Sequence, residues 1–290
     1  RQRQMCIRDR PYGVTWKKDQ QFVLAESLNP NGRFSAGTPR ISDGQLLFLQ
    51  HMISKMEPDG ARIGVVTNGS PLFSGGAGSG ESNIRKWIIE NDWLEAIVAL
   101  PTDLFYNVGI QTYLWFLTNK KSKERKGKVQ LIDASGIFHQ AKKSLGNKRK
   151  DITEADVEQI LKLYLDFEEN DHCRIFPNKF FGSYELTVCQ PKRDECGNVV
   201  TKRNGQKEVA KTDTESIAIG TDWKAHFATE VLPHIDPESW VDISKTKISY
   251  EINFSRYFYK HESLRQSEEI ATDIRHREQN IQSLLSELFN

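Results

Sequence analysis

The order of apolar and polar positions predicts helices and strands in alternation across the first half of the chain. After a loop rich in Gly, Pro and Asn, a helix is expected from Ser42 or Asp43, with one apolar face: Leu46, Leu49, Ile53 and Met56. The β-branched residues of 62–67 predict a short buried strand. A second helix is expected from Ser82, with three residues facing inward: Ile84, Trp87 and Ile88.

Three further strands are expected at 95–100, 111–118 and 128–133, which are rich in β-branched and aromatic residues. Helices and strands first alternate, and strands then follow one another. This order predicts the second half of an open α/β sheet that ends in an antiparallel pair. A helix is then expected from Thr153, which stands with Asp156 at the positions of a capping box. Its predicted apolar face comprises Val157, Ile160, Leu161, Tyr164 and Phe167.

The last third of the chain predicts a boundary followed by a mainly helical region. Residues 191–214 are polar and contain two turn signals, so they are expected to form a linker or an exposed hairpin. Region 215–290 ends in a strongly helical tail whose heptad positions are Ile270, Ile274, Arg277, Ile281, Leu284 and Leu288. Two interpretations are open, a core helix of a bundle and a coiled coil that binds a partner.

Composition narrows the class of protein without naming a function. The chain has 290 residues and a formal net charge of +1, which suits one large and one smaller domain. It has no apolar run near the length of a membrane span and no segment that resembles a signal peptide, so a cytoplasmic location is expected. The four cysteines form no Cys-x-x-Cys pair and no zinc-ligand spacing with histidine, so no metal site is expected.

Charge is strongly segregated although the total is close to zero. Segment 120–150 carries eleven Lys and Arg residues against Glu124 and Asp133, whereas 151–171 carries eight acidic residues against Lys162. A basic block of this kind can contact phosphates and hold a nucleic acid in register. The alternative is a solvated surface loop followed by an acidic helix.

Pro11 and Tyr12 are the candidate catalytic residues. Amino-group methyltransferases that act on nucleic acids carry the motif Asn/Asp/Ser-Pro-Pro-Tyr/Phe/Trp, and residues 9–12 read Asp-Arg-Pro-Tyr. An exocyclic amine is a poor nucleophile, so such a site needs oxygens aimed at its N–H bonds and an aromatic residue that stacks on the extruded base. Tyr12 would be that stacking residue, although Pro-Tyr dipeptides are common in proteins without this activity.

Two other segments bear on the same chemistry. The glycine-rich stretch 75–80 is a candidate phosphate cradle, or else a mobile loop, because it lies beyond the end of its predicted strand instead of at the turn. Residues 1–10 show neither helical nor strand periodicity and are expected to be an artefactual, non-native segment. On that interpretation Asp9 is not a catalytic residue.

Taken together, these blocks resemble the modification (methyltransferase) subunit of type I restriction-modification systems. Leu100-Pro101-Thr102-Asp103-Leu104-Phe105 is similar to the Leu-Pro-x-x-Leu-Phe signature of that family. The other similar blocks are 11–16, 43–52, 83–87, 109–112, 181–184 and 249–259.

The resemblance implies a fold, an activity and partners. The fold would be the C-terminal half of an S-adenosylmethionine-dependent, Rossmann-like methyltransferase sheet, with residues 11–190 as a partial catalytic domain and 215–290 as a helical region for subunit docking. The activity would be methyl transfer from S-adenosyl-L-methionine to adenine N6 in double-stranded DNA. The partners would be a specificity subunit and a restriction subunit, with no membrane involved.

Departures from the family pattern give a further expectation. The family's S-adenosylmethionine motif precedes the catalytic motif, and no counterpart is expected before Pro11. The 290-residue chain is therefore expected to lack cofactor binding and catalysis by itself. A competing hypothesis is a non-catalytic DNA-binding or assembly module that docks a specificity subunit.

Overall fold

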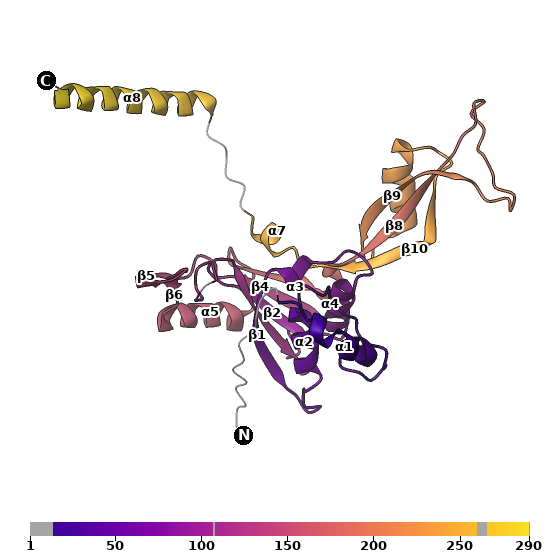
Figure 1. Ribbon diagram of the computed structural model, residues 1–290, viewed down its shortest axis with the longest axis horizontal. Helices are drawn as coiled ribbons and strands as arrows, with labels where there is room; N and C mark the ends of the chain where they lie inside the picture. Colours follow the sequence, from indigo (N-terminus) through magenta and orange to yellow (C-terminus); the bar gives the residue numbers. More distant parts are fainter. Residues whose placement is uncertain (1–13, 107, 260–265, 290) are drawn as a thin grey trace. The chain divides into compact units, whose positions relative to one another are not determined.

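The computed structural model describes residues 14–106, 108–259 and 266–289 (Figure 1). The chain divides between Tyr257 and Phe258 into two units, and each is described by itself. The first unit contains three β-sheets and the helices that pack on them. Most of the second unit is one long helix, α8 (Ser267–Phe289).

The largest sheet has five strands in the order β1-β3-β2-β4-β7. Their bounds are β1 (Arg62–Asn68), β2 (Leu94–Ala99), β3 (Thr112–Thr118), β4 (Lys128–Asp133) and β7 (Cys173–Pro177). β3 lies between β1 and β2 and is antiparallel to both, whereas β2 and β4 are parallel. The predicted α/β class is confirmed, as are the four strands expected between residues 62 and 133.

Helices cover the sheet so that its central strand is buried along its whole length. Every residue of β2 is buried, which is the pattern of a strand with both faces covered. The helices of this part are α1 (Gln20–Ser27), α2 (Gln45–Ile53), α3 (Ser70–Phe73), α4 (Gly80–Glu90) and α5 (Glu154–Asp166). The first two helices predicted from the sequence correspond to α2 and α4.

Helix α5 begins as predicted, and its buried face agrees with the prediction in part. The Thr153 hydroxyl accepts from the Asp156 amide while the Asp156 carboxylate accepts from the Thr153 amide, which completes the capping box. The predicted apolar face was partly wrong, because the side chains of Val157 and Leu161 are 53% and 49% exposed. The residues packed against the sheet are two of the predicted ones, Ile160 and Tyr164, together with Leu163.

A second sheet has the order β10-β8-β9 and closes the first unit. Its strands are β8 (Gly182–Pro191), β9 (Val209–Ala218) and β10 (Trp240–Tyr250). The exposed connection 192–208 joins β8 to β9, which pair in antiparallel fashion. Region 215–290 contains helices, including α6 (Trp223–His226) and α7 (Phe254–Phe258), but also β10. Residues 192–208 of the expected linker or hairpin connect β8 to β9, and residues 209–214 belong to β9 itself. The chain divides after Tyr257 instead.

The third sheet is a small hairpin, β5 (His139–Leu145) and β6 (Lys148–Asp151). It follows β4 and precedes α5, so the basic block expected near the middle of the chain is partly a hairpin. Within the described ranges, the structure contains no helix that is both long and apolar enough to cross a membrane.

Candidate active site

The strands of the five-stranded sheet define one edge at which functional side chains gather. Residues Asn68 and Thr112 pair at this edge, as do Ala99 and Asp133. The carboxyl ends of β1, β2 and β4 therefore meet there, together with the beginning of β3. Open α/β sheets bind their ligands outside the carboxyl ends of the strands. This edge, called the carboxyl edge below, is the expected position of a site.

A buried polar cluster lies where β1 ends. Gln45 donates from its side-chain amide to Asp43 Oδ1 at 2.9 Å and to Asn68 Oδ1 at 2.9 Å, and its own carbonyl oxygen accepts from the Asn68 amide at 3.0 Å. Asp43 and Gln45 are both less than one-tenth exposed. Because the Gln45 side chain both donates to and accepts from Asn68, the start of α2 is fixed to the end of β1.

Trp16 attaches the segment that follows the Pro-Tyr pair to this same cluster. Its indole N–H donates to the Arg40 carbonyl at 2.9 Å and its backbone N–H donates to the Ile41 carbonyl at 3.1 Å. A Cβ at Gly44 would lie 3.3 Å from the Trp16 ring, so glycine lets the ring pack closely against the start of α2. The chain at Trp16 is thereby held beside the carboxyl edge.

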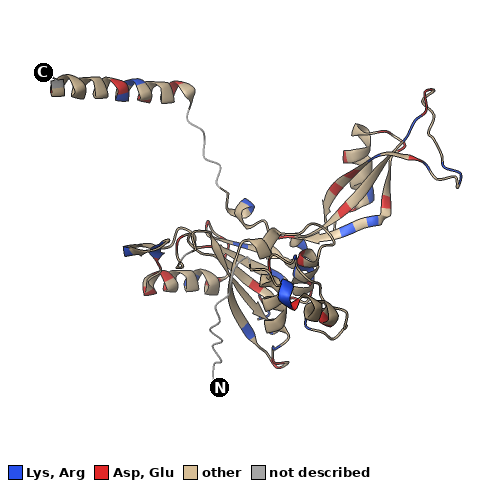
Figure 2. Cartoon of the chain, in the orientation of Figure 1, with Lys and Arg blue, Asp and Glu red and all other residues tan. Residues whose placement is uncertain are grey.

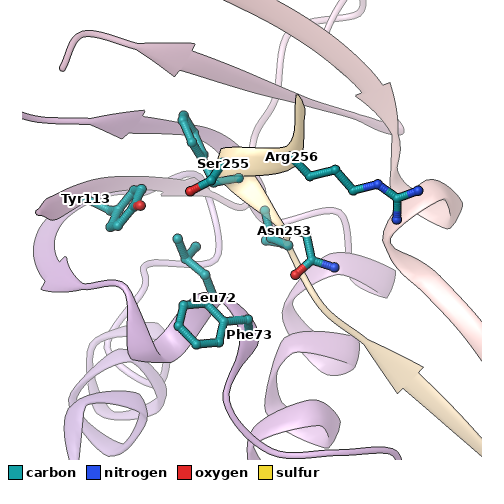
Figure 3. Close-up of a pocket in the computed structure, with 8 residues that line it drawn as sticks. Leu72, Phe73, Tyr113, Asn253, Ser255 and Arg256 are labelled. Carbon is teal, nitrogen blue, oxygen red and sulfur yellow. The ribbon is translucent and has the colours of Figure 1, made fainter. Parts of the chain in front are cut away.

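A pocket of about 340 Å³ opens at the carboxyl edge (Figure 3). Its walls come from three segments far apart in sequence, namely α3, the start of β3 and residues 252–256. Figure 3 shows the Arg256 side chain extending away from Tyr113 and Leu72. The lining residues are Leu72, Phe73, Tyr113, Ile252, Asn253, Phe254, Ser255 and Arg256.

The lining combines aromatic surface with a few polar groups. The rings of Tyr113 and Phe254 meet edge to face with centroids 5.3 Å apart. Burial raises the pKa of Tyr113, so its hydroxyl stays protonated at neutral pH and donates to Gln111 Oε1 at 3.1 Å. A mainly apolar lining with a few polar groups is typical of small-molecule sites.

Arg85 holds in place the chain that leads to the third wall of the pocket, residues 252–256. Its guanidinium is fully buried and donates to the carbonyls of Tyr250, Pro71, Ser74 and Gly75. Burial lowers its pKa to about 10, so it is still charged at neutral pH. One buried cation thus joins the chain after α3 to the end of β10.

Further hydrogen bonds continue this attachment along the C-terminal segment. The Tyr250 amide donates to Ser82 Oγ at 2.9 Å and the Ile252 amide to the Leu72 carbonyl at 2.9 Å. The Tyr250 hydroxyl donates to Glu90 Oε1 at 3.0 Å. Residues 250–254 are therefore a fixed strap across α3 and α4.

The glycine-rich stretch 75–80 does not fit a phosphate or a nucleotide-like cofactor. The Gly75 carbonyl accepts from Arg85, and the Gly78 amide donates to the Ile248 carbonyl at 3.3 Å. A Cβ at Gly80 would lie 1.8 Å from the Thr38 carbonyl oxygen, so this glycine allows two backbone segments to touch. The stretch packs against the protein's own chain, and we assign no described residue to S-adenosylmethionine.

The sequence-predicted site residues have different outcomes. Pro11 and Tyr12 lie outside the described residues, so their catalytic role stays a prediction. The Leu-Pro-x-x-Leu-Phe block forms the connection from β2 to β3 at the carboxyl edge, where Leu104 and Phe105 pack against the core. Sequence reasoning missed the wall at 252–256, because only long-range contacts bring it to Tyr113.

Comparison with known proteins identifies the family. The family model described as "N-6 DNA Methylase" matches residues 1–179. The HindI methylase subunit of a type I restriction enzyme from Haemophilus influenzae is 37% identical over 135 residues, which cover 47% of this chain and 28% of that protein. The MjaIX methylase subunit from Methanocaldococcus jannaschii is 32% identical over 140 residues, covering 48% and 24%.

A solved structure gives a third comparison. The type I restriction-modification methyltransferase subunit from Streptococcus thermophilus is 25% identical and has a TM-score of 0.48, over 58% of this chain and 32% of that one. The chain spans about a quarter of the length of the two curated relatives it matches. Since the family model covers more than half of its residues, the chain belongs to the N-6 DNA methylase family, among relatives that are methylase subunits of type I restriction enzymes.

Proposed function

We propose that this chain is part of a site-specific, adenine-N6 DNA methyltransferase of a type I restriction-modification system. The enzyme would transfer a methyl group from S-adenosyl-L-methionine to an adenine that has left the base stack. The observation that carries the proposal is the match of the N-6 DNA methylase model to residues 1–179. The aromatic pocket at the carboxyl edge supports it, because it offers apolar walls where this fold class binds ligands.

Tyr12 would stack on the adenine, and Pro11 would restrict the backbone before it. Trp16 supports this assignment, since it is held beside the carboxyl edge and follows Tyr12 by only four positions in the sequence. Four residues of extended chain span at most ~14 Å.

Helix α8 supports the proposed docking to a specificity subunit. Its heptad positions are apolar except for Arg277, and five of these apolar residues are between 43% and 77% exposed: Ile270, Ile274, Ile281, Leu284 and Leu288. An apolar stripe of this length on one helix is typical of a coiled-coil seam that a partner helix covers. A restriction subunit would join the same assembly, and enzymes that methylate cellular DNA are expected in the cytoplasm.

The test compares the methyltransferase activity of the 290-residue chain with that of a longer chimera. The purified 290-residue chain, mixed with its specificity subunit, adenine-containing duplex and tritiated S-adenosylmethionine, is expected to transfer no methyl group. The informative sample is a chimera of the HindI methylase subunit. In it, this chain's segment that contains Tyr12 replaces the matching segment of that subunit. It is expected to methylate adenine N6.

Two variants of the chimera test the site. Tyr12→Ala should remove activity, whereas Tyr12→Phe should retain most of it, because stacking needs the ring and not the hydroxyl. A chimera that folds, binds its specificity subunit and S-adenosylmethionine, and yet methylates only cytosine would refute the proposed function. Full activity of Tyr12→Ala would refute the role given to Tyr12.

A further inference from the structure

The basic block 120–150 does not form one surface, because its two parts lie at opposite edges of the five-stranded sheet. Strand β3 ends at Thr118 and β4 begins at Lys128, and both positions lie at the edge away from the pocket. Residues 120–128 connect them there. The second part is the β5–β6 hairpin, which follows Asp133 at the carboxyl edge.

Several cations at the far edge serve the protein's own packing. Lys121 Nζ lies 2.5 Å from Asp92 Oδ1 and donates to the Lys128 carbonyl at 2.7 Å. The Arg125 guanidinium is less than one-tenth exposed and donates to Gln130 Oε1 at 2.8 Å. The charges of Lys121 and Arg125 are therefore not available to bind a ligand.

The hairpin presents its cations to solvent. Segment 139–151 has five Lys and Arg residues and one carboxylate, Asp151, which pairs with Lys148 at 2.6 Å. The side chains of Lys142, Lys143 and Arg149 are exposed, and the described part of the chain supplies no ion-pair partner for them. Figure 2 shows basic residues on β5 and β6. A positive field of this kind attracts polyanions.

The hairpin is fixed to the carboxyl edge by hydrogen bonds. The backbone amides of Arg149 and Lys150 donate to the Asp103 carbonyl at 2.9 and 3.2 Å, and Lys150 Nζ donates to Thr102 Oγ1 at 3.2 Å. Asp103 has a φ of +57°, an uncommon value that these two bonds help to hold. The same connection leads into β3, and Tyr113 near its start lines the pocket.

We propose that the β5–β6 hairpin binds the sugar-phosphate backbone of duplex DNA beside the nucleotide that enters the carboxyl edge. The proposal rests on the proposed function and gives it a DNA-contacting element. Lys and Arg side chains on an exposed ribbon neutralise phosphates without reading bases, which suits a subunit whose site is read elsewhere. Helix α5 follows directly with exposed carboxylates at Glu154 and Glu158, so the DNA would lie over the hairpin and away from that helix.

The test compares two double variants of the 290-residue chain with equal loss of charge. Lys142→Gln/Lys143→Gln removes two exposed lysines of the hairpin, and Lys123→Gln/Lys126→Gln removes two exposed lysines of the same block at the far edge. Binding to a fluorescein-labelled duplex is measured by anisotropy over a salt series. The hairpin variant should lower the slope of log K against log salt by about 2, and the far-edge variant should leave it unchanged.

Each other outcome overturns the proposal in a recognisable way. An unchanged slope for the hairpin variant, or an equal change for both variants, rejects the hairpin while DNA binding by the chain stands. Competition by poly-glutamate as effective as that by DNA, at equal charge, makes the hairpin a general polyanion surface and also rejects it. A wild-type chain without measurable duplex affinity rejects both the hairpin and the proposed DNA partner. Equal thermal unfolding midpoints confirm that the variants are folded.

Discussion

Replacing Arg85 with methionine should loosen the wall of the pocket and destabilise the first unit. Arg85→Met keeps a long apolar side chain but removes the donor from four carbonyl oxygens. The carbonyls of Ser74 and Gly75 are only partly buried and can bond water, whereas those of Pro71 and Tyr250 are buried. The two buried carbonyls therefore determine the loss in the free energy of unfolding.

The magnitude follows from two opposing effects. An unsatisfied buried carbonyl costs about 1–3 kcal/mol, so two cost roughly 2–6 kcal/mol. Burial lowers the pKa of Arg85 to about 10, and removing the charge recovers a desolvation cost of about 3 kcal/mol. Subtracting this recovery leaves an expected loss in the free energy of unfolding of about 0–3 kcal/mol, centred near 1 kcal/mol. For a unit of this size, the centre of that range corresponds to a fall in Tm of about 2–4 °C.

Thermal unfolding and amide hydrogen exchange measure this change. The amides of Tyr250 and Ile252 should exchange faster, because the strap is held through them, while those of β2 keep their protection. Lys86→Met, at the next position of α4 and only half-buried, is the matched control and should change neither quantity. An unchanged Tm together with full protection of Ile252 in Arg85→Met would refute the proposed role of the buried cation.

Three further predictions concern α8, the cap of α5 and the exposed connection between β8 and β9. Ile274→Asp with Ile281→Asp should abolish co-purification with the proposed specificity subunit, since both side chains lie on the exposed apolar stripe. Thr153→Ala should lower the free energy of unfolding by about 1 kcal/mol in urea titrations, because it removes the hydroxyl of the capping box. Asp236, whose pKa Arg193 lowers to about 2, should titrate far below its usual range in carboxyl NMR spectra. Because the folded-state pKa is depressed, this contact stabilises above pH ~4 and is lost as the pH falls toward 2.

Controls keep these predictions falsifiable. Gln282→Asp, which lies off the apolar stripe of α8, should leave co-purification intact, and retained binding by the double Asp variant would contradict docking through α8. Thr153→Ser should behave as wild type, and an equal loss for both substitutions would point away from the hydroxyl. Arg193→Ala should return Asp236 to an ordinary titration; if Asp236 already titrates near pH 4 in the wild type, the ion pair is absent in solution.

Local patterns predicted the elements whose signals lie within a few residues. The α5 cap is an example, since Thr153 and Asp156 are three positions apart and satisfy each other's backbone groups. The strands predicted at 95–100 and 128–133 from their β-branched residues correspond to β2 and β4, whose middle residues are buried. In each case burial and propensity favour the same structure, so the sequence alone is sufficient.

Elements that depend on distant partners were not predicted. Strand β10 lies in a region expected to be mainly helical, and it forms because it pairs with β8 about sixty residues earlier. The buried position of Arg85 was also missed, since an isolated arginine on a helix is ordinarily exposed. The pocket depends on both features, and for that reason its third wall has no counterpart in any local motif.

The contact between Arg85 and Tyr250 has a consequence for synthesis of the chain. The two residues are 165 positions apart, and translation adds about 5–20 residues per second. Roughly 8–33 seconds therefore pass on the ribosome between the appearance of the cation and that of its last acceptor. During this interval Leu72 lacks the cover of residues 250–254, and the pocket is completed only when nearly the whole of the first unit has been made.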